Sequence, residues 1–150
     1  TSIDINGSPE QIWSAITNIE HSADMIQAII KIEVLETASE GLIGFKWRET
    51  REMFGKEAIE TMWITDAETN IYYRTRAENH GTVYISELRI TPKSDGVCEL
   101  SMSFNGIARS LFAKIMSAIL MPFFKGSMVK MLDQDLADIK KHVETKATEQ

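Results

Sequence analysis

The chain has 150 residues, of which 43% are hydrophobic and 25% are charged, a balance typical of a soluble globular domain. Its net charge of −6, with no run of lysine and arginine, argues against nucleic acid as a partner, because that contact needs a basic surface. The single cysteine, Cys98, rules out a disulfide within these residues, and we expect no secretory leader. We therefore expect one cytoplasmic domain over residues 1–150.

The N-terminal segment predicts a short strand followed by two short helices. Residues 1–5 alternate between polar and apolar, as a strand with one buried face does. Ser8 and Gln11 form a capping box around Pro9, which favours a helix start at this point. A second helical turn follows, and residues 29–37 again read as a strand.

The middle of the chain predicts antiparallel strands joined by tight turns. Turn residues occur at Phe54-Gly55, around 67–70, at 79–81 and at 94–96. These spacings predict strands near residues 43–52, 56–65, 70–78, 82–91 and 97–105.

The C-terminal segment predicts one long helix. Apolar residues recur at helical spacing from Ile107 to about Lys146. Pro122 and Gly126 should bend this helix. Residues 111–124 are apolar on nearly every side, more than one buried face requires, and a membrane or a partner protein is a weaker alternative to a core position.

This order of elements, with three sequence stretches, resembles a known family. The stretches are "SPEQIWSAITNIE", "GFKWRETREMFGKEA" and "LDQDLADIKKHVE". The chain resembles the START/pollen-allergen-like helix-grip superfamily and, within it, the polyketide cyclase/dehydrase and lipid-transport (SRPBCC) family. The resemblance implies an α+β fold in which a curved antiparallel sheet of about seven strands wraps around the long C-terminal helix. It also implies a cavity for apolar ligands between the sheet and that helix.

A two-residue turn at Phe54-Gly55 sets which side chains share a face of the sheet. It places Glu49 opposite Glu60 and puts both on the more apolar face, which we assign to the inside. Arg48 and Glu52 then belong to the outer face. With two-residue turns at Ala67-Glu68 and Asn79-His80, the expected inner-face residues are Phe45, Trp47, Glu49, Arg51, Ala58, Glu60, Met62, Ile64, Ile71, Tyr73, Thr75, Ala77, Thr82, Tyr84, Ser86, Leu88, Ile90, Cys98, Leu100, Met102 and Phe104.

Polar residues on this inner face predict a band that crosses the sheet through Glu49, Arg51, Glu60, Thr75 and Tyr84. One interpretation is a structural ion-pair cluster at the mouth of the cavity. The other is that these groups orient the polar end of a ligand or exchange protons with it, which makes Glu49, Glu60, Arg51 and Tyr84 the catalytic candidates. The expected ligand-binding residues are Phe45, Trp47, Glu49, Arg51, Glu60, Met62, Tyr73, Thr75, Tyr84, Leu100, Met102, Phe104, Phe112, Met116 and Leu120.

No cofactor or metal is expected. His21, His80 and His142 are scattered, so no pair has the spacing of metal ligands. The chain has no glycine-rich phosphate loop and no dinucleotide fingerprint. Cys98 has no activating neighbour in the sequence and reads as a small buried hydrophobe.

Three functional hypotheses follow. The first is a non-enzymatic binder or carrier of a small hydrophobic or amphipathic molecule, such as a lipid, a polyketide or an isoprenoid. The second is an enzyme of the aromatase/cyclase or dehydratase type, in which cavity shape folds a flexible substrate and a few polar groups move protons. The third is a protein-interaction or stress-response module that acts through its long helix.

Overall fold

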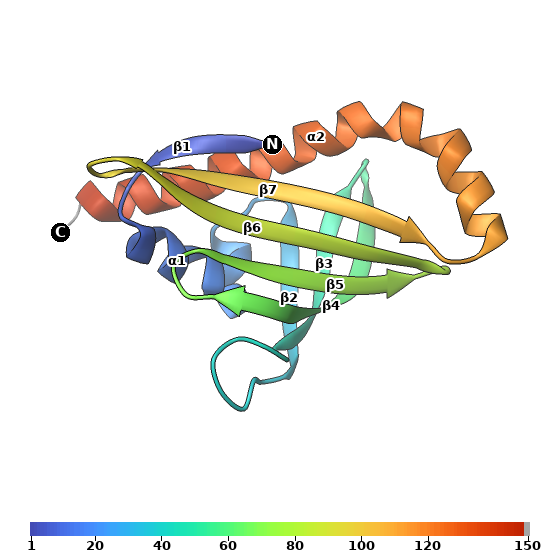
Figure 1. Ribbon diagram of the computed structural model, residues 1–150, viewed down its shortest axis with the longest axis horizontal. Coiled ribbons are helices and arrows are strands. Elements are labelled where there is room, and N and C mark those ends of the chain that lie inside the picture. The colour runs from blue at the N-terminus through green and yellow to red at the C-terminus, as the bar shows by residue number, and fades with distance from the viewer. Residues whose placement is uncertain (149–150) are drawn as a thin grey trace.

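The computed structural model describes residues 1–148, which form one curved sheet, a long helix and two short helical segments (Figure 1). The elements in chain order are β1 (Ser2–Asn6), α1 (Pro9–Thr17), the 3₁₀ helix η1 (Ile19–Asp24), β2 (Ile29–Glu36), β3 (Lys46–Met53), β4 (Lys56–Glu68), β5 (Tyr72–Asn79), β6 (Thr82–Ser94), β7 (Val97–Ala108) and α2 (Leu111–Thr148).

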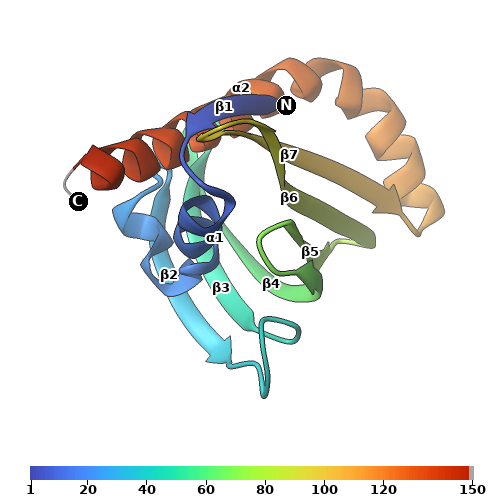
Figure 2. The same cartoon turned by 60° about the vertical axis from the view of Figure 1, so that its left-hand side comes forward.

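The seven strands are antiparallel in the order β1-β7-β6-β5-β4-β3-β2. The sheet curves, and the C-terminal part of α2 crosses its concave side together with α1 (Figure 2). This is the α+β arrangement of curved sheet and long helix that the sequence predicts. The core lies between these layers and includes Ile5, Ile12, Ile64, Leu100, Leu136 and Ile139, all almost completely buried.

The start of α1 forms as the sequence predicts. The Ser8 backbone N–H donates to Gln11 Oε1 at 2.9 Å, and the Gln11 N–H donates to Ser8 Oγ at 3.3 Å. These two bonds satisfy amide groups that a helix end leaves free. Ile12 and Ile16, one turn apart on the same face, are buried against the sheet layer.

The β3–β4 hairpin has the predicted register. Phe54 and Gly55 both have positive φ, 53° and 75°, as a two-residue turn between twisted strands requires. Glu49 lies opposite Glu60, and Trp47 lies opposite Met62. The predicted inner face is therefore correct for this hairpin.

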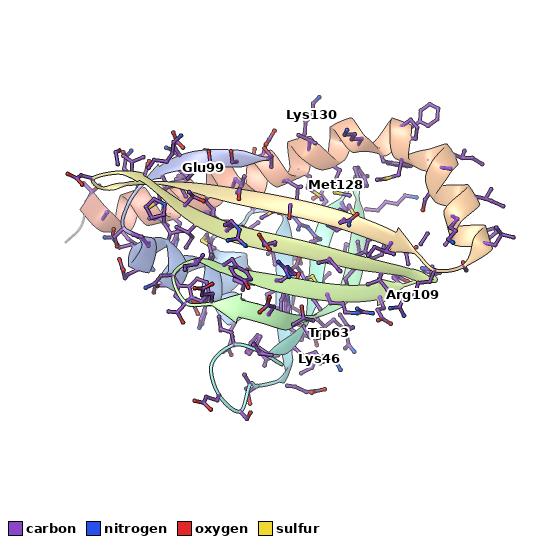
Figure 3. All side chains as sticks on the ribbon, viewed as in Figure 1. Lys46, Trp63, Glu99, Arg109, Met128 and Lys130 are labelled. Atoms are coloured by element: carbon purple, nitrogen blue, oxygen red, sulfur yellow. The ribbon has the colours of Figure 1, made fainter. Side chains whose placement is uncertain are left out.

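The two tryptophans of the hairpin lie on opposite faces, as expected from the alternation of side chains along a strand. Trp47 is 4% exposed and packs in the core. Trp63 lies on the outer face opposite Lys46, whose Nζ is 6.0 Å from the centre of the indole ring (Figure 3). Arg48 and Glu52 are both exposed on that outer face, as predicted.

The two-residue turns that the register assumed at Ala67-Glu68 and Asn79-His80 are displaced by one or a few residues. β4 continues to Glu68, so the chain turns after it rather than at Ala67-Glu68. The second turn consists of His80 and Gly81, not Asn79 and His80.

The predicted inner faces nevertheless survive these shifts. A bulge between Ile64 and Asp66 changes the alternation of β4 by one residue, which compensates for the displaced turn. Tyr73, Thr75 and Ala77 consequently point inward and are buried. Ile71 is the exception, because it lies in the turn and is 37% exposed.

The long helix begins later than predicted and has two unlike halves. β7 continues to Ala108, so α2 starts at Leu111 rather than near Ile107. Ser110 caps α2, because its Oγ accepts the Ala113 N–H at 3.0 Å. The first half of the helix bends away from the sheet, and Pro122 lies in this half, as the sequence predicts (Figure 1).

We call residues 111–130 the exposed arm and residues 133–148 the packed half of α2. Ala113 is the one buried side chain of the exposed arm. The packed half buries Asp135, Leu136, Asp138, Ile139 and Val143. The sequence marked residues 111–124 as apolar on nearly every side but favoured a core position for them, whereas the structure leaves most of them exposed.

Candidate functional site

Arg51 joins the sheet to the long helix through a buried ion pair. It projects inward from β3, and its Nη2 donates to both carboxylate oxygens of Asp135 on α2, at 2.9 and 2.8 Å. The side chains are 15% and 4% exposed. An arginine held by both oxygens of a carboxylate is fixed in orientation as well as in position. The pair therefore positions the packed half of α2 on the inner face of the sheet.

Glu49 is the second carboxylate at this guanidinium. Its Oε1 lies 3.4 Å from Arg51 Nη1, and its Oε2 accepts from Trp47 Nε1 at 3.5 Å. Both distances are long, so these bonds are weaker than the pair with Asp135. Burial raises the pKa of Glu49 above its ordinary value, and the positive charge of Arg51 opposes this only in part.

The pKa of Asp135 is set by the same opposing effects of burial and the Arg51 charge. Burial raises its pKa, the charge and hydrogen bonds of Arg51 lower it, and the nearby carboxylate of Asp138 adds to the increase. One guanidinium thus faces two buried carboxyl groups, Glu49 and Asp135. Burial therefore favours the protonated form of these carboxyl groups more than in isolated carboxylates, and Arg51 opposes it.

Glu60 lies beside this cluster on the next strand, opposite Glu49. It is half-buried, and within residues 1–148 no hydrogen bond to its carboxylate is seen. Burial raises its pKa, and Arg51 again opposes the increase. Of the inner-face carboxyl groups in this cluster, Glu60 is thus the most accessible.

The predicted polar band does not cross the sheet as one row. Because the β4–β5 pairing is shifted, Thr75 lies opposite Ile64 rather than Glu60. Its hydroxyl lies 2.8 Å from that of Ser86, across the β5–β6 pair. Tyr84 lies opposite Ala77. The band is therefore divided into a charged cluster on β3, β4 and α2 and a separate hydroxyl pair on β5 and β6.

Tyr84 and Phe104 form an aromatic pair on the inner face. Their rings are stacked with centroids 5.6 Å apart. Gly106 lies opposite Tyr84, and a side chain at that position would meet the ring at 3.5 Å. Tyr84 is half-buried and Phe104 is 38% exposed, although both face inward. This end of the inner face is accessible because α2 bends away from it (Figure 2).

The other predicted ligand-binding residues differ in how deeply they are buried. Trp47, Tyr73 and Leu100 are buried in the core, and the Tyr73 hydroxyl donates to the Ile16 carbonyl at 3.2 Å. Burial raises the pKa of Tyr73, which suits a structural hydroxyl better than a proton donor. The half-buried residues are Phe45, Met62 and Met102, and the exposed ones on the arm are Phe112, Met116 and Leu120.

Two site residues were missed by the sequence analysis, Asp135 and Asp138. Both are buried, and Asp138 accepts from the Gln27 N–H at 2.9 Å and from the Gln27 and Gln134 side chains at 3.0 Å each. The signal was present in the sequence. These aspartates fall at the same helical spacing as Leu136 and Ile139, and a carboxylate on the apolar face of a helix requires a buried partner.

Surface depressions along the packed half of α2 lie away from the charged cluster. One of about 700 Å³ is lined by Ala137, Lys140, Lys141, Glu144, Thr145 and Thr148. Another, of about 300 Å³, lies between α1 and α2. Neither contains Glu49, Arg51 or Asp135, so the cavity expected between the sheet and the helix stays a prediction.

The described part of the chain offers no obvious metal centre. Residues 1–148 contain no group of three or more His, Cys, Asp or Glu side chains arranged to hold an ion. Cys98 is 2% exposed, and burial raises the pKa of its thiol. This agrees with its interpretation as a small buried hydrophobe rather than a nucleophile.

Comparison with known sequences gives the family. The model of the polyketide cyclase/dehydrase and lipid-transport family matches residues 1–144. The chain belongs to this family. No curated protein matches the chain in a sequence search.

Three solved structures show how widely the fold of this family is shared. An aromatase/cyclase from a Streptomyces species has a TM-score of 0.75 at 14% identity, covering 98% of this chain and 93% of that one. A START superfamily protein from Mycobacterium smegmatis has a TM-score of 0.73 at 17% identity, with coverage of 97% and 95%. A norcoclaurine synthase from Thalictrum has a TM-score of 0.71 at 14% identity, with coverage of 98% and 93%. These likenesses establish the helix-grip fold of the START superfamily for this chain.

Proposed function

We propose that this protein binds a small apolar or amphipathic molecule between the inner face of its sheet and α2. The observation that carries the proposal is the accessible aromatic pair, Tyr84 and Phe104, on a face that is otherwise the core side of the sheet. Half-buried Met62 and Met102 extend this apolar surface toward the core. Methionine and stacked aromatic rings adapt to irregular apolar shapes.

The charged cluster supplies the polar end of the same site. Glu60 is half-buried beside Met62 on β4, and Arg51 lies one strand away. A ligand that carries a hydroxyl or an amine is expected to place it near Glu60 and its apolar part on the aromatic pair. An apolar surface with few polar groups is the usual composition of a small-molecule site.

Binding is tested by the fluorescence of Trp47, which is buried beside Phe45 with ring centres 5.9 Å apart. The variant Trp13→Phe/Trp63→Phe leaves Trp47 as the single reporter. We expect its emission to change on titration with at least one of a fatty acid, an isoprenoid alcohol and an anthraquinone. Native mass spectrometry of the purified protein, followed by solvent extraction, checks for a molecule that co-purifies.

Phe104→Ser on the reporter protein should weaken that binding at least about tenfold, since an apolar contact of this size is lost. The matched control is Ile59→Ser, which removes an exposed apolar side chain from the outer face. Equal binding by both variants, or no response and no co-purifying molecule, would contradict the proposal.

A second candidate is an aromatase/cyclase type of enzyme. The observation that favours it is the cluster of three inner-face carboxyl groups, Glu49, Glu60 and Asp135, around Arg51, because burial raises their pKa values and such groups take up protons more readily than ordinary carboxylates. Turnover of a β-keto thioester analogue, lost in Glu60→Gln, would support this function. Ligand binding without turnover would favour the carrier.

A further inference from the structure

The exposed arm of α2 combines an apolar surface with an unusual local charge. Between Glu99 and Asp133 the sequence contains no acidic residue but four basic ones, Arg109, Lys114, Lys125 and Lys130. The rest of the chain holds 12 of the 16 basic residues and all 22 acidic residues, a net charge of −10. The arm and its flanks are therefore a cationic segment on an acidic protein.

The apolar side chains of the arm are exposed on several sides of the helix. An 18-residue stretch of α2 has a mean hydropathy of 1.4 and contains no buried residue. Phe123 is 79% exposed and Met121 is 57% exposed. The most exposed apolar side chains of the arm include Leu111, Phe112, Ile115, Ile119, Met121 and Phe123. Apolar surface of this extent on a soluble domain marks an interaction site.

Both ends of the arm are fixed to the folded body. At its start, the Arg109 N–H donates to the Gly81 carbonyl at 2.9 Å, and Ser110 caps the helix. At its end, the helix continues into the packed half that Arg51 holds on the sheet. By length and composition α2 is long enough to cross a membrane. A segment with both ends held on one side lies in an interface instead of crossing it.

We propose that the exposed arm docks this protein on an anionic lipid surface, with its apolar side chains in the acyl boundary and its lysines at the headgroups. Arg109 and Lys130 lie at the two ends of the apolar stretch and Lys114 and Lys125 lie within it; Lys130 points away from the sheet, while Arg109 lies at the end of β7 (Figure 3). Long lysine side chains reach headgroups while their stems remain in an apolar layer. Anionic headgroups complement the local positive charge and repel the acidic remainder of the chain.

A second copy of the chain fits this surface less well. A symmetric dimer pairs a surface patch with itself, so arm-to-arm contact would bring six lysines together with no acidic residue between them. Such an interface would also cover one side of the arm and leave apolar side chains on the other side exposed.

The test is co-sedimentation with vesicles of phosphatidylcholine alone and with phosphatidylglycerol added. We expect binding to the anionic vesicles, little binding to the neutral ones, and release by salt. The variant Lys114→Gln/Lys125→Gln/Lys130→Gln should weaken binding by about fivefold per lysine, or about a hundredfold in total. Phe123→Ser should weaken it at least about tenfold.

The matched control for charge is Lys31→Gln/Lys141→Gln/Lys146→Gln, which removes three exposed lysines outside the arm and gives the same net charge. The matched control for apolar surface is Ile43→Ser, at a side chain 55% exposed in the loop before β3. Equal loss in arm and control variants would overturn the proposal, as would equal binding to neutral vesicles. A dimer in analytical ultracentrifugation that the Phe123→Ser variant abolishes, with no vesicle binding, would also overturn it. The Trp47 titration is independent of this result, so the two proposals fail separately.

Discussion

The two halves of α2 differ in what their side chains meet, although they are one continuous helix. The packed half places Leu136 and Ile139 at 1% exposure against the sheet and ties Asp135 to Arg51. On the exposed arm, the side chain of Phe112 is 74% exposed. The arm does contact the β3–β4 hairpin at one point, where the rings of Phe124 and Phe54 have centres 5.5 Å apart. The comparison shows that apolar composition alone does not determine burial. The helix is packed against the sheet where it also forms an ion pair with a side chain of the sheet, Asp135 with Arg51.

The largest effect on this difference is expected from removing Arg51, the residue of the sheet that pairs with the packed half of α2. Arg51→Met should lower the free energy of unfolding at pH 7 by about 3–5 kcal/mol, because it leaves the buried carboxyl groups of Glu49 and Asp135 uncompensated. The pKa values of both groups are already raised in the folded state and should rise further without Arg51.

The direction of the pH dependence follows from those shifts. A carboxyl group whose folded pKa lies above its unfolded pKa stabilises the fold below the unfolded value, and that contribution is lost as pH rises through the folded value. The decrease in the free energy of unfolding caused by Arg51→Met should therefore be smaller at pH 5 than at pH 7. Urea unfolding at both pH values measures this decrease.

A second substitution identifies which carboxylate matters most. Asp135→Asn in the Arg51→Met background should recover more stability than Glu60→Gln, because Asp135 makes the two short bonds and Glu60 makes none to Arg51. Equal stability of Arg51→Met and the wild type at both pH values would show that the cluster is solvated and does not hold the helix.

A smaller effect is expected from truncating one apolar side chain in each half of α2, which compares their packing. Leu136→Ala should cost about 2–5 kcal/mol, since it removes a fully buried side chain and leaves a cavity. Ile119→Ala, on the exposed arm at 56% exposure, should cost no more than about 0.5 kcal/mol. Urea unfolding of the pair gives the contrast directly. Similar costs would mean that the arm packs on the sheet in solution.

The smallest expected effect tests the arm as a helix. Gly126→Ala should stabilise it by about 0.5–1 kcal/mol, because alanine is a better helix former and nothing lies within 4 Å of the added methyl group. The change should appear as slower amide exchange within residues 111–130. If the variant instead lowers the global stability, the helix needs the flexibility of Gly126 to bend away from the sheet.

Part of the site follows from the sequence because it depends on local rules. The turn at Phe54-Gly55 and the alternation of side chains place Glu49 opposite Glu60 and Arg51 on the same face, and the structure has this register. The later turns were misplaced, so the position of Thr75 relative to Glu60 was wrong. A bulge inside a strand has a weak sequence signal, because it depends on the fit between neighbouring strands.

The sequence by itself determined which elements form and which face of each strand is apolar, since capping, turn chemistry and alternation act over a few residues. Only the tertiary structure decided that Arg51 meets Asp135, which lies 84 residues further along the chain. It also decided that the helix is packed after this contact and exposed before it. The physical reason is that helical periodicity gives the apolar positions of α2, whereas burial depends on which of them the curved sheet reaches.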